Sequence, residues 1–110
     1  MTVNNAIQAL SLEAISVADG NRNIKGGYTG DLLSWVMGRA ESGNAWITIM
    51  SNINILAVAS LLDLSCIILA ESAEVSDELI KTSAEKSINL LRSKKSSYTL
   101  CCELGKLLEQ

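Results

Sequence analysis

Residues 51–70 read SNINILAVASLLDLSCIILA, and this stretch decides whether the chain enters a membrane or folds as a layered domain. A transmembrane helix needs about 20 consecutive apolar residues with few charges. This stretch holds Asp63 near its middle, and a carboxylate at the bilayer centre costs about 2.5 kcal/mol or more. The first half is rich in Leu and Ala, whereas residues 66–69 form a short, Ile-rich run. We therefore expect a helix and then a buried strand, with no membrane span.

The same pattern of helix and strand extends in both directions from this stretch. The apolar runs at 45–50, 66–69 and 89–92 lack polar alternation, which is typical of strands buried on both faces. Apolar residues at helical spacing predict helices at 3–10, 30–37, 53–62, 77–87 and 96–108. Residues 12–17 alternate as a strand, 24–28 are either a strand or a loop, and Asp63 is expected to end its helix at the surface. Together these elements predict one α/β domain over residues 1–110, with three layers (α/β/α) and a mostly parallel sheet.

The residue types present exclude several kinds of site. The chain has no histidine, so catalysis or metal binding through histidine is excluded. Three cysteines are too few for a disulfide framework, and we expect Cys66, Cys101 and Cys102 to be reduced thiols. Cys101 and Cys102 are predicted to act as small hydrophobic side chains on the apolar face of the last helix. No metal site is predicted.

The charge balance argues against a nucleic-acid partner. Nine Lys and Arg face twelve Asp and Glu, for a net charge of −3, whereas proteins that bind phosphate backbones concentrate positive charge. The basic run Arg92-Ser93-Lys94-Lys95 is expected to be a solvated loop between a strand and a helix rather than an anion contact. No signal-peptide pattern stands at the N-terminus, so we expect a cytoplasmic protein.

The candidate ligand site follows from the expected sheet. Ligands of open parallel sheets bind at the carboxyl ends of the strands. Residues 26–31 contain three glycines, so this loop either approaches a ligand or forms a turn in which Thr29 or Asp31 caps the next helix. Residues 48–54 carry the same ambiguity, because Ser51 and Asn54 are good capping residues. The candidate ligand-binding residues are Gly26, Gly27, Thr29, Asp31, Thr48, Ser51, Asn52, Asn54 and Glu71.

A subunit contact is expected at the helix of residues 53–62. Only Asn54 and Ser60 are polar there, so its outer side needs a cover. A second copy of the chain is the preferred cover, and neighbouring helices of the same monomer are the alternative. The candidate interface residues are Ile53, Leu56, Ala57, Ser60 and Leu61. Trp35 and Trp46 are expected to be packing anchors, although a half-exposed Trp35 would also suit a subunit contact.

Three strings, GGYTGDLLSWVM (26–37), AWITIMSNINILAVASLLDLSCIIL (45–69) and the helix-strand-helix tail, resemble the DRTGG domain family. More narrowly, the chain is similar to short stand-alone members among the accessory proteins of iron-only hydrogenase systems in anaerobic bacteria. The resemblance implies an α/β fold like the N-terminal domain of the HPr kinase, usually dimeric, occurring alone or attached to nucleotide-sensing or acyl-transfer enzymes. This chain departs from the family motif: Ser51-Asn52 replaces its Asp-Arg pair, and Ala70-Glu71-Ser72 replaces its Thr-Gly-Gly.

Two function hypotheses follow. The first is a non-catalytic regulatory module, dimeric, that binds a small-molecule ligand or a protein partner; the resemblance implies a role accessory to an iron-only hydrogenase or related anaerobic redox metabolism. The alternative is a small enzyme that uses Asp31 or Glu71 as acid or base on a small metabolite. The first is favoured, because a catalytic carboxylate needs a neighbour within hydrogen-bond reach and the sequence shows no convincing pair. The sequence does not name the ligand or any cofactor.

Overall fold

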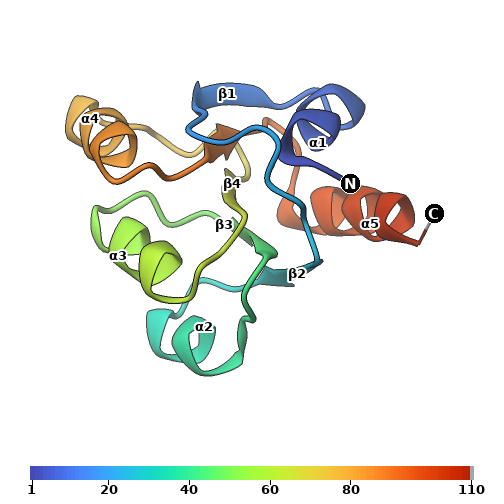
Figure 1. The fold of residues 1–110 in the computed structure, drawn as a ribbon, viewed down its shortest axis with the longest axis horizontal. Helices are drawn as coiled ribbons and strands as arrows, with labels where there is room; N and C mark the ends of the chain where they lie inside the picture. Colours follow the sequence, from blue (N-terminus) through green and yellow to red (C-terminus); the bar gives the residue numbers. More distant parts are fainter. Residues whose placement is uncertain (110) are drawn as a thin grey trace.

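The computed structural model describes residues 1–109, which form a sheet between two layers of helices (Figure 1). The strands are β1 (Glu13–Ser16), β2 (Gly26–Thr29), β3 (Asn44–Thr48), β4 (Cys66–Leu69) and β5 (Leu90–Arg92). The helices are α1 (Val3–Ala9), α2 (Leu33–Arg39), α3 (Asn54–Leu61), α4 (Asp77–Glu85) and α5 (Ser97–Leu108). The strand order is β1-β5-β4-β3-β2, in which β2 to β5 are parallel and β1 is antiparallel to β5. The expected α/β fold with a mostly parallel sheet is confirmed.

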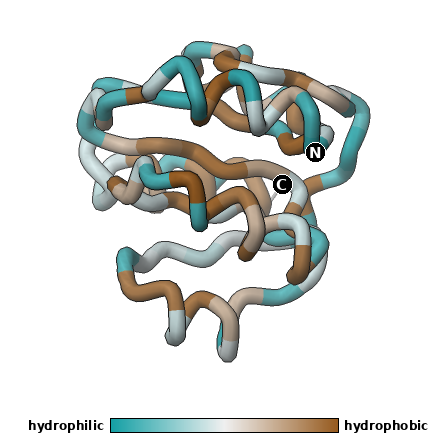
Figure 2. Tube along the Cα trace, turned by 90° about the vertical axis from the view of Figure 1, so that its left-hand side faces the viewer, coloured by the Kyte–Doolittle hydropathy of each residue, from teal (hydrophilic) through white to brown (hydrophobic). Residues whose placement is uncertain are grey.

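The central strands bury side chains on both faces, which explains why their sequences lack polar alternation. Helices α1 and α5 lie on one side of the sheet, and α2, α3 and α4 lie on the other (Figure 1). Odd and even positions of each strand therefore enter different cores. One core takes Ala45, Ile47, Cys66, Ile68 and Leu91, and the other takes Trp46, Ile67, Leu69 and Leu90. Figure 2 shows hydrophobic residues recurring along the segments in the middle of the fold, with hydrophilic residues at many connecting turns.

The stretch of residues 51–70 folds as helix α3, a turn and strand β4, as predicted. The chain reverses at Asp63, an exposed residue with φ of 56°. Its carboxylate accepts hydrogen bonds from Arg22 Nη1 at 3.0 Å and from Ser42 Oγ at 2.7 Å. These bonds lower the pKa of Asp63 to about 2. Within residues 1–109, no helix has both the length and the apolar character that crossing a membrane requires.

The segment after β1 is fastened to the sheet by one buried amide side chain, that of Asn89. Its Oδ1 accepts hydrogen bonds from the N–H groups of Ala18 and Asp19, at 2.8 and 2.9 Å. Its Nδ2 donates to the carbonyl of Asp19 at 2.8 Å and to that of Ser65 at 3.0 Å. A single side chain at the start of β5 therefore joins the loop after β1 to the loop before β4.

The expected helix caps are wrong in two places. Helix α3 begins at Asn54, and Asn52 rather than Ser51 accepts a hydrogen bond from the Asn54 N–H, at 2.9 Å. Helix α2 begins at Leu33 with Leu32 at the N-cap position and no side-chain cap. Thr29 is unavailable as a cap because it is the last residue of β2, and the Asp31 carboxylate binds the end of β3 instead.

The two tryptophans have different environments. Trp46 is fully buried, as expected of a packing anchor, and its indole N–H donates to the carbonyl of Gly30 at 3.0 Å. Trp35 is 53% exposed on α2, so the anchor prediction is wrong for it. The Arg39 guanidinium lies over the Trp35 ring, 3.6 Å from its centroid, in a cation–π contact. Trp35 therefore belongs to the surface of the molecule.

Two further residues differ from the prediction in their burial. Leu56 is fully buried between α3 and the sheet, so it is not available for a subunit contact. The outer side of α3 carries Ala57, Ser60 and Leu61, all exposed, while Ile53 is partly buried. Cys102 is exposed and Cys101 partly buried, so only Cys101 packs against the core side of α5. Neighbouring positions on a helix are about 100° apart, so Cys101 and Cys102 do not share one narrow face.

Candidate functional site

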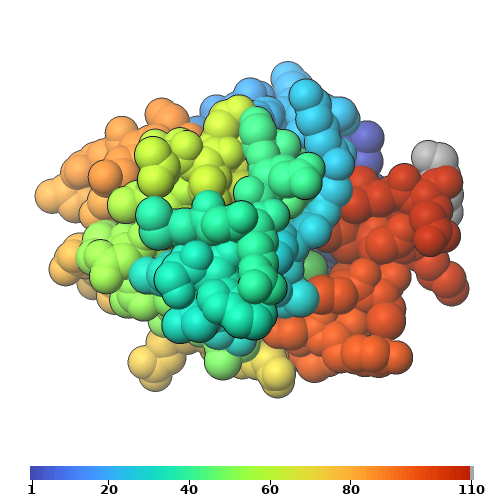
Figure 3. Space-filling model, turned by 90° about the horizontal axis from the view of Figure 1, so that it is seen from below, coloured from blue at the N-terminus to red at the C-terminus, as the bar shows by residue number. Residues whose placement is uncertain are grey.

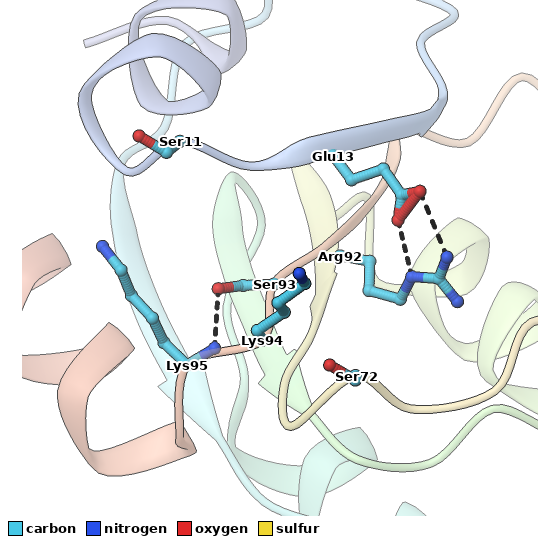
Figure 4. Close-up of a pocket in the computed structure, with 7 residues that line it drawn as sticks. All are labelled: Ser11, Glu13, Ser72, Arg92, Ser93, Lys94 and Lys95. Atoms are coloured by element: carbon cyan, nitrogen blue, oxygen red, sulfur yellow. Dashed lines mark hydrogen bonds and ion pairs between the residues drawn. The ribbon is translucent and has the colours of Figure 1, made fainter.

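A cleft opens at the carboxyl edge of the sheet, beside the ends of β4 and β5. Because β1 runs antiparallel to β5, the start of β1 reaches the same edge. The cleft has a volume of about 520 Å³ and is lined by Ser11, Glu13, Ser72, Arg92, Ser93, Lys94 and Lys95 (Figure 4). The basic run that the sequence suggested to be a mere solvated loop thus supplies four of the seven lining residues. Sequence reasoning missed this site because it judged the run without knowing which segments face it.

Ion pairs hold two of the three cations in the cleft. Arg92 Nε lies 2.7 Å from Glu13 Oε2, and Arg92 Nη2 lies 3.1 Å from Glu13 Oε1. The hydrogen bond from Arg92 lowers the pKa of the Glu13 carboxyl. Lys95 Nζ lies 2.7 Å from Glu103 Oε1 of α5. Lys94 is exposed and forms no ion pair within residues 1–109. The cleft therefore carries one cation that is not already paired.

Hydroxyl groups supply further donors in the cleft. Ser93 is buried, and its Oγ accepts a hydrogen bond from the Lys95 N–H at 3.0 Å. Its hydroxyl hydrogen has no acceptor among the described hydrogen bonds, so it is free to donate to a ligand. Ser11 and Ser72 lie on opposite sides of the segment that carries Arg92 to Lys95 (Figure 4). The arrangement of ammonium and hydroxyl donors suits a polar, negatively charged ligand.

The turn after β4 brings Ser72 to the cleft through an unusual backbone. Glu71 and Ser72 have φ values of 58° and 54°, a left-handed conformation that costs a residue other than glycine about 1–2 kcal/mol. The Glu71 N–H donates to the Lys95 carbonyl and the Ser72 N–H to the Ser93 carbonyl, both at 2.9 Å. These bonds fix the turn against the basic loop. The φ values at Glu71 and Ser72 are ones that glycine adopts without strain.

A second cleft of about 470 Å³ adjoins the first. It is lined by Ser51, Ser72, Glu74, Val75, Ser76 and Arg92, so the two clefts share Ser72 and Arg92. Ser51 is a predicted ligand-binding residue, and Glu71 immediately precedes the shared Ser72. Both clefts thus lie at the carboxyl edge of the sheet, and most of their lining residues come from the ends of β4 and β5 rather than from the glycine loop.

The other predicted residues lie elsewhere. Asp31 accepts hydrogen bonds from Thr48 Oγ1 at 2.7 Å and from the Ile49 N–H at 2.9 Å, so it joins the end of β2 to the end of β3. Asn52 and Asn54 form the turn that begins α3. The remaining three predicted residues belong to β2, where Gly27 and Thr29, but not Gly26, line a mainly apolar pocket of about 280 Å³ against α5.

The two carboxylates considered as acid or base do not form a pair. Asp31 follows β2 and Glu71 follows β4, and β3 lies between these strands. Strands in a sheet are about 4.8 Å apart, so the two backbones are about 10 Å apart. In residues 1–109, no three side chains of the types Cys, Asp and Glu come together as a metal-binding group. Asp31 therefore has a structural role at the ends of β2 and β3, and Glu71 is part of the turn after β4, away from Asp31.

Comparison with known proteins identifies the fold. No family model and no curated protein matches the sequence. Among solved structures, the chain is similar to the CBS and DRTGG domains of the regulatory region of Clostridium perfringens pyrophosphatase, complexed with the activator diadenosine tetraphosphate. The TM-score is 0.73 at 17% identity, over 94% of this chain and 45% of that chain. This chain thus spans less than half of the solved chain, and the likeness concerns the fold. The shared fold agrees with the resemblance to the DRTGG domain family seen in the sequence.

Proposed function

We propose that the chain is a single regulatory domain that binds a small-molecule ligand in the cleft beside β4 and β5 and does not convert it. The observation that carries this proposal is the cleft itself, which is open to solvent at the carboxyl edge and is rich in hydrogen-bond donors. The similar pyrophosphatase region supports it, because that region is the regulatory part of its protein and its structure contains the activator diadenosine tetraphosphate. Nucleotides are therefore the first compounds to test.

A thermal-shift screen of nucleotides, acyl phosphates and redox cofactors tests the proposal. A ligand at 100 times its Kd stabilises the folded state by about 2.7 kcal/mol, which raises the Tm of a domain of this size by roughly 10 °C. Amide resonances of residues 92–95 are expected to shift with the same compound. The compound is expected to remain intact after prolonged incubation. Turnover that disappears in Asp31→Ala or Glu71→Ala would instead establish the enzyme alternative.

We also propose that the domain forms a homodimer through the outer faces of α2 and α3. Leu32, Trp35 and Met37 are exposed on or next to α2, and Leu61 is 70% exposed on α3. These two helices pack against each other. Figure 3 shows α2 projecting from this face beside α3, and Figure 2 shows hydrophobic residues along α2, the lowest element in that view. Clustered apolar surface of this kind commonly marks a protein contact.

Sedimentation at micromolar concentration tests the dimer. A particle of twice the chain mass of 11.8 kDa is expected. Leu61→Asp is expected to give the monomer, because it places a charge in the contact. Tyr98→Asp is the matched control, since Tyr98 is the most exposed of the large hydrophobic side chains described and lies on α5. A wild-type particle of 11.8 kDa, or equal effects of the two variants, would reject this interface.

From the sequence resemblance alone, we propose that the domain acts in the cytoplasm, in an iron-only hydrogenase system or related anaerobic redox metabolism. The test is co-purification of a tagged copy with the hydrogenase proteins of the source cell. The Leu61→Asp variant and a Lys94→Ala variant then show whether such a partner contacts the apolar face or the cleft.

A further inference from the structure

We infer that the cleft holds its ligand through a phosphate group, with Lys94 as the main cation and the hydroxyls of Ser72 and Ser93 as further donors. This inference rests on the proposed ligand-binding function and names the chemistry of the ligand. The phosphate is either free inorganic phosphate or the phosphoryl group of an ester, and both have the same oxygen atoms to offer these donors.

The concentration of positive charge points to an anion. The chain is acidic overall, with a net charge of −3, yet three of its nine Lys and Arg residues fall within residues 92–95. All three line the same cleft, where Glu13 is the sole acidic lining residue. Lys94 extends toward the middle of the site in Figure 4, while Arg92 points to Glu13. An anion near Lys94 therefore gains a charge partner without first breaking an ion pair.

The number of donors favours phosphate over a carboxylate. A monocarboxylate carries a single charge, which Lys94 alone balances, and it offers only two oxygens to the three donors. A phosphate monoester has three terminal oxygens and a charge of about −1.5 to −2 at pH 7, so it accepts from the ammonium and from both hydroxyls. The higher charge also competes better with the carboxylates of Glu13 and Glu103 for the cations that they hold.

Recruiting those paired cations costs little. The side chains of the Arg92–Glu13 pair are 28% and 54% exposed, and both side chains of the Lys95–Glu103 pair are 39% exposed. Ion pairs that water reaches to this extent are weak and are screened by salt. Arg92 Nη1 also donates to the Ala73 carbonyl at 3.2 Å, so Nε and Nη2 are the groups that exchange Glu13 for a bound phosphate, for which the planar guanidinium is well suited.

The start of α5 adds to the positive potential beside the cleft. Lys95 directly precedes Ser96, the N-cap of this 12-residue helix, whose Oγ accepts from the Thr99 N–H at 3.1 Å. The N-terminal end of a helix carries partial positive charge from its unpaired N–H groups. The basic loop and the N-terminal end of α5 therefore both attract a negatively charged ligand.

The test is a titration of the 15N-labelled protein with inorganic phosphate, ribose 5-phosphate, ribose and acetate at constant ionic strength. The two phosphates are expected to shift the amides of residues 92–95, and ribose and acetate are not. Tighter binding of ribose 5-phosphate than of phosphate identifies an ester as the ligand, and equal binding identifies free phosphate. Lys94→Ala is expected to weaken phosphate binding about tenfold or more, the loss of one charge-assisted hydrogen bond. Lys94→Arg is expected to retain most of it.

Lys86→Ala is the matched control, because Lys86 ends α4 and is an exposed lysine at the opposite edge of the sheet. It changes the net charge equally and is expected to leave binding unchanged. The inference is overturned if acetate binds as well as phosphate, if neither phosphate binds, or if Lys86→Ala weakens binding as much as Lys94→Ala. A phosphate-free compound that binds the cleft would overturn the phosphate inference alone and leave the regulatory domain standing. Absence of any ligand at the cleft would overturn both.

Discussion

Replacement of Asn89 by alanine is expected to cost more stability than any surface substitution in this domain. The change removes four hydrogen bonds of 2.8 to 3.0 Å in one step. Ala18 and Asp19 are exposed, so water can replace the amide at their backbone groups, whereas the Ser65 carbonyl belongs to a buried residue and loses its partner. At about 0.5–1 kcal/mol for each bond, the loss in the free energy of unfolding is about 2–4 kcal/mol. That is a large share of a total of about 5–15 kcal/mol.

Urea denaturation followed by tryptophan fluorescence measures this loss, provided that the denaturant dependence of the variant matches that of the wild type. Amide exchange adds a local readout, because the N–H groups of Ala18 and Asp19 are expected to exchange faster in Asn89→Ala. Asn21→Ala is the matched control: Asn21 is exposed, its side chain takes part in none of the described hydrogen bonds, and the expected effect is within about 0.5 kcal/mol. A loss below about 1 kcal/mol for Asn89→Ala would refute the view that this amide fastens the loop after β1 to the sheet.

Three further outcomes are expected. Glu71→Gly is expected to stabilise the domain by up to about 1 kcal/mol in urea denaturation, because glycine adopts the φ of 58° without strain; destabilisation would contradict the strained-turn interpretation. Asp63 has its pKa lowered from 3.8 to about 2, chiefly by hydrogen bonding to Arg22. The pair therefore stabilises the fold above pH 3.8, and this contribution is lost as the pH falls toward 2. Asp63→Asn is expected to make the Tm depend less on pH between these two values. An unchanged pH dependence of the Tm in the variant would disprove this role of Asp63. Burial raises the pKa of Cys66 from 9.0 to about 12. An alkylating reagent at pH 8 is therefore expected to label the exposed Cys102 in the native protein and Cys66 only in the unfolded protein, as read by mass spectrometry. Labelling of Cys66 in the native protein would contradict this expectation. Because burial penalises the thiolate of Cys66, its contribution to the stability of the fold is full below pH 9.0 and is lost as the pH rises toward 12.

The candidate site shows where reasoning from sequence reached its limit. The rule that ligands bind at the carboxyl ends of parallel strands pointed to the edge where the two clefts lie, and Ser51 lines one of them. It failed for Asp31, whose carboxylate is used by Thr48 and by the Ile49 N–H. The sequence does not give the order of the strands. It therefore does not show that residues 92–95 face Glu13 of β1 across a cleft.

The amino-acid sequence by itself determined the elements and their layers. The uninterrupted apolar strands around Trp46 and Ile67 can be stable only with helices on both faces, and Asp63 breaks the long apolar stretch in two. These are local effects of burial and charge, so they can be read from neighbouring residues.

Only the tertiary structure decided which residues meet. The antiparallel addition of β1 beside β5 brought Glu13 to Arg92, 79 positions away, and closed one side of the cleft. The rotation of α3 on the sheet buried Leu56 and exposed Leu61. Both results depend on how whole elements pack, because the same side chain is core or surface according to the neighbour that its face meets.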